Sequence, residues 1–187
     1  MPRFPAGGVI ALAVVVGSGS LVLFAVFLFL GPLGLIDLGL SPRDVLILDA
    51  TLCLAFCVQH SLMVRKAFRG RFEAVVPPHY HGAAFTLASA IMLLGMVLLW
   101  QESPVVVVGL EGGSRWLVRA VFLAALPGFL WGARSSPEFD PFGVGPIKTR
   151  LRGREPRPWP FTVRGPYRWV RHPQYLFALV LVWAYPD

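Results

Sequence analysis

Four long apolar segments constrain the fold of this chain more than any other feature of its sequence. They cover residues 8–30, 45–64, 83–100 and 116–133 and contain 23, 20, 18 and 18 residues. About 20 apolar residues in a helix cross the hydrocarbon core of a bilayer. The composition agrees, because 56% of the residues are hydrophobic and only 14% are charged. We therefore predict an all-α integral membrane protein with four transmembrane helices, forming a single domain over residues 1–187.

A fifth apolar segment, residues 175–185, is shorter than the others. Its 11 residues would rise about 16 Å as a helix, which is about half of the hydrocarbon thickness. Pro173 suits the first turn of such a helix, because its missing N–H would have no partner there. We expect this segment to be the start of a fifth helix, and the sequence to be incomplete at its carboxyl end.

The distribution of positive residues predicts the orientation of the helices. If the four segments cross a membrane, 14 of the 17 lysines and arginines lie on the side of the amino terminus and three lie on the other. Cytoplasmic loops of membrane proteins carry an excess of lysine and arginine. We therefore predict that the amino terminus and residues 134–171, a loop rich in proline and arginine, are cytoplasmic.

The net charge of +7 is compatible with nucleic acid or with an anionic membrane surface as a partner. Most of the excess positive charge lies in the loop at residues 134–171. Basic residues beside membrane helices follow the topology and attract anionic headgroups. Membrane lipids, and not nucleic acid, are the expected partners.

Polar residues near the end of the second apolar segment need an explanation. Gln59 and His60 lie about one turn inside the predicted cytoplasmic end of this segment. Polar groups at that depth are costly unless they face the bundle interior, a cavity or the interface. They either make hydrogen bonds between helices or line a site. Cys53, Cys57 and His60 are metal-ligating types, but no second group of ligands accompanies them, so no metal is expected.

The sequence RWVRHPQY precedes the fifth apolar segment. Arg171 and His172 come directly before Pro173, and Tyr175 follows in the first turn of the expected helix. An arginine can hold a carboxylate through two hydrogen bonds, and a tyrosine ring can stack on an aromatic ligand. Two interpretations stay open from the residues alone: a clamp for an anionic ligand with an aromatic group, or an anchor at the membrane interface.

The sequence DPFGVGP, residues 140–146, contains a Gly-x-Gly pair. A dinucleotide-binding loop needs a strand before the glycines and a helix after them. Neither is predicted here, so we interpret the segment as a proline- and glycine-containing turn.

Two blocks of sequence carry a resemblance to a known family. GPYRWVRHPQY resembles the Arg-His-Pro-x-Tyr signature of the isoprenylcysteine carboxyl methyltransferase and phospholipid methyltransferase superfamily. Together with FCVQHSLMVRKAF and the loop that begins FDPFGVGP, it is most similar to the bacterial branch that includes methanethiol S-methyltransferase. The resemblance covers about residues 45–187 and leaves out the first apolar segment.

The resemblance implies a membrane-embedded enzyme that transfers a methyl group from S-adenosylmethionine to a small or lipophilic acceptor. The acceptor class, thiol, carboxylate or amine, stays open, and a bacterial inner membrane is the expected location. The residues implied for the cofactor site are those of the signature: Arg171, His172, Pro173 and Tyr175. Gln59 and His60 are implied for the substrate pocket, with His60 as the candidate catalytic residue.

Three departures from the family pattern are visible. The family continues past the signature through a full helix, a further helical stretch with paired glutamates and a tail, whereas the sequence given stops at Asp187. Phe177 stands where the family usually has a small residue, and residues 79–82 replace a Glu-Arg-Ser segment. Two further functions therefore stay open. One is a non-catalytic relative that binds lipid or a protein through its basic loop, and the other is a small transporter that uses Asp49, His60 and Arg119.

Overall fold

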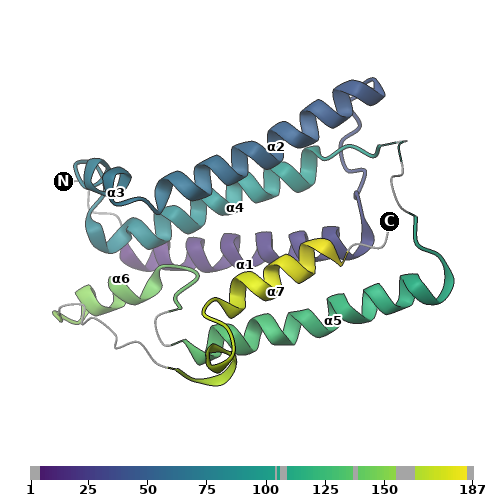
Figure 1. The fold of residues 1–187 in the computed structure, drawn as a ribbon. Coiled ribbons are helices and arrows are strands. Elements are labelled where there is room, and N and C mark those ends of the chain that lie inside the picture. Colours follow the sequence, from purple (N-terminus) through teal and green to yellow (C-terminus); the bar gives the residue numbers. More distant parts are fainter. Residues whose placement is uncertain (1–4, 104, 106–108, 137–138, 155–162, 185–187) are drawn as a thin grey trace. The chain divides into compact units, whose positions relative to one another are not determined.

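The computed structural model describes residues 5–103, 105, 109–136, 139–154 and 163–184. Within these residues every regular element is a helix, and no strand is present. The elements are arranged along the chain in this order (Figure 1): α1 Ala6–Leu30, α2 Pro42–Met63, α3 Lys66–Phe72, η1 Pro78–Tyr80, α4 His81–Leu99, α5 Gly112–Ser135, α6 Val144–Leu151, η2 Gly165–Arg168 and α7 Pro173–Trp183.

Four helical segments are long and apolar enough to cross a membrane. They are α1, α2, the continuous stretch of η1 and α4, and α5. Each contains one of the four apolar segments of the sequence almost completely. The shorter helix α7 has 11 residues and begins at Pro173, where the sequence predicts a fifth helix. The prediction of an all-α membrane protein is confirmed.

Local sequence explains where α2 begins. Its N-cap residue is Ser41, whose hydroxyl accepts the N–H of Asp44 at 3.3 Å. Pro42 occupies the first position of the helix, where its missing N–H removes no hydrogen bond. The negative carboxylate of Asp44 lies in the first turn, where it interacts favourably with the positive end of the helix dipole. These three residues therefore start α2 before its apolar run begins.

The contacts divide the chain into two compact units. Unit 1 contains Met1–Ala25, Pro32–Ser103 and Asp140–Arg157, and unit 2 contains Val26–Gly31, Pro104–Phe139 and Pro158–Asp187. Each unit has its own buried residues and its own polar contacts. The single domain expected over residues 1–187 stays a prediction.

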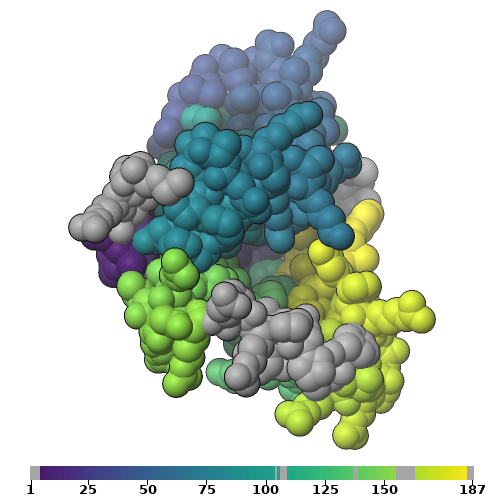
Figure 2. All heavy atoms as spheres, turned by 90° about the vertical axis from the view of Figure 1, so that its left-hand side faces the viewer, coloured from purple at the N-terminus to yellow at the C-terminus, as the bar shows by residue number. Residues whose placement is uncertain are grey.

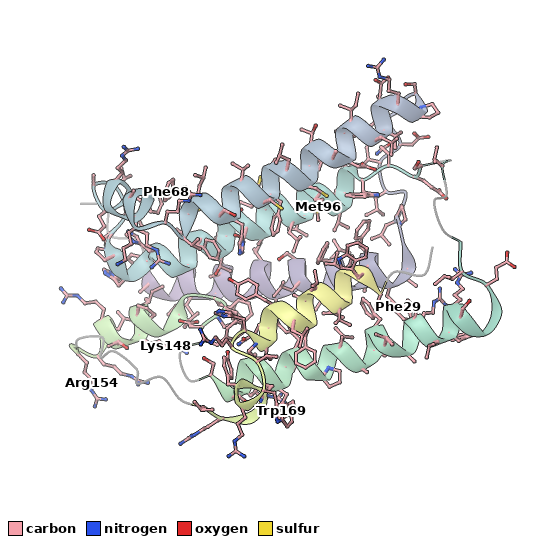
Figure 3. The ribbon with its side chains drawn as sticks, viewed as in Figure 1. Phe29, Phe68, Met96, Lys148, Arg154 and Trp169 are labelled. Carbon is pink, nitrogen blue, oxygen red and sulfur yellow. The ribbon has the colours of Figure 1, made fainter. Side chains whose placement is uncertain are left out.

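The core of unit 1 joins three helices that are far apart in the sequence. Ala13 of α1, Ala83 of α4 and Ile147 of α6 are at most 1% exposed and pack together. Small side chains at two of these positions let the helices approach closely. In the same unit α2 runs along α4 (Figure 1), and the Met96 side chain lies between them (Figure 3). Within unit 1, α6 of the basic loop is therefore held against α1 and α4.

The prediction for DPFGVGP is correct for the turn and wrong for the residues after it. The N–H of Gly143 donates to the Asp140 carbonyl at 3.2 Å, and Gly143 has φ +63°, a conformation that favours glycine. Helix α6 then begins at Val144. The Asp140 carboxylate accepts the N–H of Gly145 at 2.6 Å, which satisfies a first-turn donor. Pro146 is compatible with this first turn, so neither Pro146 nor the glycines prevent the helix.

The turn before α6 is attached to the helices of unit 1 at several points. The Thr86 hydroxyl of α4 donates to the Pro141 carbonyl at 2.9 Å. A Cβ added at Gly82 would lie 2.6 Å from the Gly143 Cα, so the two backbones touch. Phe142 packs against Gly17 of α1, where an added Cβ would lie 3.0 Å from the ring. The turn at residues 140–143 and helix α6, which belong to the predicted loop, are therefore packed within unit 1. Residues 155–162 of that loop lie outside the described residues.

Unit 2 buries Phe122 of α5 to 2% exposure, with the Phe29 ring 5.5 Å away. The guanidinium of Arg119 lies over two aromatic rings, 5.3 Å from the centroid of Phe29 and 5.6 Å from that of Trp116. Cation–π contacts of this kind stabilise an arginine inside an apolar segment. Arg119 thus has a packing role within unit 2, which explains a charge that the sequence placed one turn inside a span.

Candidate functional site

The Arg-His-Pro-x-Tyr signature forms the start of α7. Arg171 and His172 are exposed and come directly before the helix, and Pro173 is its first residue. Tyr175 in the first turn is 74% exposed, and its ring meets the His172 ring edge-on with centroids 5.6 Å apart. The structure therefore brings a guanidinium, an imidazole and a phenol together at the amino end of one helix.

Helix α5 holds this signature in place through two glycines. Pro173 is buried against Gly132, where an added Cβ would lie 3.5 Å from the proline ring. One turn earlier, a Cβ at Gly128 would lie 2.6 Å from Cδ1 of Phe177. Small residues four apart let two membrane helices approach closely. These glycines were not predicted as site residues, although the Gly-x-x-x-Gly pattern in an apolar span is the sequence signal that marks them.

The segment η2, which precedes the signature, also contacts it and packs on α5. The Tyr167 hydroxyl donates to Gln174 Oε1 at 2.6 Å, which links η2 to the first turn of α7. Gly165 has φ +51°, and an added Cβ would lie 3.0 Å from Nε1 of Trp131 in α5. Trp169 also meets Trp131, with ring centroids 5.4 Å apart (Figure 3). The residues before Arg171 are therefore packed on the carboxyl-terminal end of α5.

A second group of polar residues lies in unit 1, between α2 and α4; we name Gln59, His60 and Ser89 the α2–α4 polar cluster. Gln59 Nε2 donates to Ser89 Oγ at 3.3 Å, and Ser89 Oγ lies 3.4 Å from His60 Nδ1. The His60 ring contacts the rings of Phe56 and Phe85, with centroids 5.4 and 4.8 Å away. All three cluster side chains are half-buried. Gln59 and His60 thus make the contacts between helices that one of the two interpretations predicts.

From the predicted topology we also expect Gln59 and His60 to lie at the same membrane depth as His172, because both groups lie at the cytoplasmic ends of apolar segments. This stays a prediction. The first two residues belong to unit 1 and the third to unit 2. Sequence reasoning missed Ser89 altogether, because a serine within an apolar helix carries no signal of its own. Its role is evident only from the packing of α4 on α2.

Asp49 belongs to a different polar group of unit 1. Its Oδ1 accepts the backbone N–H of Gln101 at 3.2 Å, and both residues are buried. The Gln101 amide group donates to the carbonyls of Ile36 and Leu99, each at 2.8 Å, and accepts the N–H of Leu38 at 3.0 Å. Asp49 and Gln101 therefore fix the segment after α1 to the ends of α2 and α4, which is a structural role.

Exposed positive side chains gather on two short helices of unit 1. Figure 2 shows α6 in green on the face turned to the viewer, and Figure 3 labels Lys148 in the middle of α6 and Arg154 just after its end. Helix α3 and its N-cap contribute further positive residues. The exposed members of both groups are Arg65, Lys66, Arg69, Arg71, Lys148, Arg150, Arg152 and Arg154. Their charge suits an anionic headgroup layer.

These features define a class: a helical membrane protein with four apolar helices and an Arg-His-Pro-x-Tyr cluster at the start of a short further helix. Comparison with known proteins then gives the family. The family model described as NnrU protein matches residues 47–186, and the chain belongs to this family.

Curated relatives agree with the branch that the sequence resembles. The methanethiol S-methyltransferase of Pseudomonas deceptionensis is 34% identical over 156 residues, which is 80% of this chain and 57% of that protein. The methanethiol S-methyltransferase of Mycobacterium tuberculosis is 27% identical over 187 residues, covering 94% and 76%. That of Pseudomonas sp. (strain GM41(2012)) is 33% identical over 149 residues, covering 78% and 56%. The predicted resemblance to the methanethiol S-methyltransferase-like branch is confirmed.

The chain spans only part of the length of these relatives. The match covers 57% of the Pseudomonas deceptionensis protein and 56% of that from Pseudomonas sp. (strain GM41(2012)). No solved structure matches the chain. The roles of the signature and of the α2–α4 polar cluster therefore have to be argued from their own chemistry.

Proposed function

We propose that this protein is a membrane-embedded methyltransferase that transfers a methyl group from S-adenosylmethionine to methanethiol or a similarly small thiol. The observation that carries the proposal is the match to curated methanethiol S-methyltransferases over about 80% of the chain. The match to the family model, residues 47–186, includes the signature and both residues implied for the substrate pocket. A non-catalytic protein is not favoured, because each of these curated relatives is named as an enzyme.

The chemistry at the start of α7 fits S-adenosylmethionine. When bound, this cofactor supplies an electrophilic methyl group on a cationic sulfur, and it also carries a carboxylate and an adenine ring. Arg171 is exposed beside a helix amino terminus, and the side chain of the N-cap residue His172 makes no capping bond within the described residues. A first turn without a side-chain cap and a guanidinium both favour binding of an anion such as a carboxylate. The exposed Tyr175 ring is available for stacking on an aromatic group.

Pro173 has a supporting part in this proposed site. Its ring is buried against Gly132, so the start of α7 cannot shift along α5 without losing this packing. Arg171 and His172 are thereby held at a defined distance from the end of α5. Alignment of reacting groups supplies much of the acceleration in methyl transfer, because the reaction needs the nucleophile and the methyl carbon in line.

We further propose that Gln59 and His60 contact the methyl acceptor and that His60 is the catalytic residue among them. The support is their place in a half-buried polar group flanked by aromatic rings, where a small thiol would be shielded from water. In the transfer itself the acceptor sulfur forms a bond to the methyl carbon. The old sulfur–carbon bond breaks, and its electron pair stays on the departing sulfur.

The proposed location is a bacterial inner membrane with the amino terminus and residues 134–171 in the cytoplasm. The support is the excess of lysine and arginine on that side. This orientation places Gln59 and His60 about one turn inside the cytoplasmic end of α2 and the signature at the end of the basic loop. Membrane lipids would then contact the exposed positive residues of α3 and α6.

A direct assay tests the proposal. The protein in lipid nanodiscs is supplied with S-adenosylmethionine and methanethiol, and dimethyl sulfide is measured by gas chromatography of the headspace. Arg171→Ala should weaken cofactor binding about ten- to a hundredfold, as expected for a lost charge-assisted hydrogen bond. Arg168→Ala is the matched control, because Arg168 is an exposed arginine of the same segment. A folded protein that neither binds the cofactor nor forms product would refute the proposal, and equal losses in the two variants would refute the role of Arg171.

A further inference from the structure

The hydrogen bonds of the α2–α4 polar cluster have a direction. We propose that Ser89 is a positioning residue that fixes the tautomer of His60, so that neutral His60 carries its proton on Nε2 and acts as a hydrogen-bond donor to the acceptor sulfur. The consequence for the reaction rests on the proposed function. The tautomer itself does not, because it depends on the cluster alone.

The direction begins at Gln59. Its Nε2 is a donor only, so Ser89 Oγ accepts at the 3.3 Å contact. The hydroxyl of Ser89 has a single proton to give, and its other contact is His60 Nδ1 at 3.4 Å. If Nδ1 carried a proton, Ser89 Oγ would accept both bonds through its two lone pairs, and the hydroxyl proton would have no acceptor among the described residues. The hydroxyl therefore donates to Nδ1. A ring nitrogen that accepts a hydrogen bond carries no proton, so the proton of the neutral imidazole lies on Nε2.

The orientation of the Gln59 amide decides this direction, and two observations fix it. Gln59 Nε2 also lies 3.0 Å from the Met63 sulfur, which is a weak acceptor and suits an N–H. In this orientation Gln59 Oε1 is a buried acceptor without a partner among the described residues. If the amide were rotated by half a turn, the same buried position would hold an N–H₂ group with two unpaired donors. Since each unpaired buried donor raises the free energy, the observed orientation of the amide has the lower free energy of the two.

The rings around His60 limit its freedom to change partners. Phe56 precedes it by one turn on α2, and Phe85 precedes Ser89 by one turn on α4. Neither phenylalanine offers a hydrogen bond that could replace Ser89. Rotation of the imidazole to bring Nε2 to Ser89 would require both aromatic contacts to rearrange.

This tautomer changes the part that His60 plays. A base needs a free unprotonated nitrogen, and here that nitrogen is Nδ1, which Ser89 occupies. His60 Nε2–H can instead donate to a sulfur that is already ionised. The acceptor would therefore react as a thiolate whose proton has left to solvent before transfer, and no proton moves when the sulfur–carbon bond forms. The inferred substrate class is a small thiol with an accessible thiolate, in preference to a neutral amine.

Nitrogen NMR of histidine-labelled protein in lipid bilayers tests the tautomer without any need for turnover. The His60 signals are identified by their absence in His60→Asn. We expect a protonated Nε2 and an unprotonated Nδ1 in the neutral ring of the unaltered protein. Ser89→Ala should lower the ratio of the Nε2-protonated to the Nδ1-protonated tautomer about two- to tenfold, the range expected for one lost hydrogen bond. Ser89→Thr keeps the hydroxyl and should restore the original ratio.

Two results would overturn the inference. One is a protonated Nδ1 in the unaltered protein, and the other is a tautomer ratio that Ser89→Ala leaves unchanged. A purely structural serine would affect stability but would not move the nitrogen signals in this pattern. If the methyltransferase assay fails while the tautomer and its dependence on Ser89 are observed, the proposed function is refuted and the positioning role of Ser89 stands.

Discussion

Replacing Gly128 by alanine should weaken the packing of α7 on α5. The new Cβ would lie 2.6 Å from Cδ1 of Phe177, so the ring or the helix has to move. Gly132→Ala is the matched control, because it makes the same change one turn later on the same helix. Its Cβ would lie 3.5 Å from Pro173, which is an ordinary van der Waals contact.

Two opposing effects act on the stability of these variants, and only one of them differs between the two. Alanine is favoured over glycine in a helix by about 0.5–1 kcal/mol, and both variants gain this. Overpacking typically costs about 1–3 kcal/mol, and only Gly128→Ala incurs it. Gly128→Ala should therefore be less stable than Gly132→Ala by about 1–3 kcal/mol.

Reversible unfolding in SDS–detergent mixtures, followed by circular dichroism, measures this difference. Adding Phe177→Leu to Gly128→Ala should recover part of the loss, because the smaller side chain makes room for the new methyl group. The single and double variants together form a cycle that isolates the coupling between positions 128 and 177. Equal free energies of unfolding for Gly128→Ala and Gly132→Ala, or strictly additive effects in the cycle, would refute the close approach of the two helices.

Three further predictions concern unit 1 and the topology. Gln101→Ala should lower the free energy of unfolding by about 1–3 kcal/mol, because it removes three partly buried hydrogen bonds to the backbone, whereas Glu102→Ala, at an exposed neighbour, should have little effect in the same measurement. Gly82→Ala should destabilise the protein in thermal unfolding, because the new Cβ would lie 2.6 Å from the Gly143 Cα and backbone cannot rotate away as a side chain can; an unchanged melting temperature would contradict this contact. Arg152→Cys in a background without other cysteines should react with a membrane-impermeant maleimide only after cells are opened, and labelling of intact cells would contradict the predicted topology.

The four long helices could be predicted from the sequence because each coincides with an apolar run of at least 18 residues. A run of that length has few alternatives to a membrane-spanning helix, since every backbone group must be satisfied within the segment. The start of α7 was also predictable, because Pro173 is suited to the first turn of a helix. Local chemistry was sufficient in these cases.

Features that depend on a distant partner could not be predicted. Ser89 became informative only when α4 was packed on α2, and Gln101 only when its contact with Asp49 was seen. Helix α6 was missed because its glycines and proline indicate a turn, and the contacts that support it come from residues more than fifty positions away. Phe177, which departs from the family pattern, is accommodated by the missing side chain at Gly128.

The core that joins α1, α4 and α6 has a consequence for how this family is delimited. The match to the family model begins at residue 47, after α1 has ended. Yet Ala13 of α1 is completely buried, and Gly17 makes room for Phe142, a residue inside the matched region. The boundary that sequence similarity draws therefore cuts through one packed core. A helix that lies outside the matched region can therefore belong to the same packed core as the residues inside it, through small side chains at its contact points.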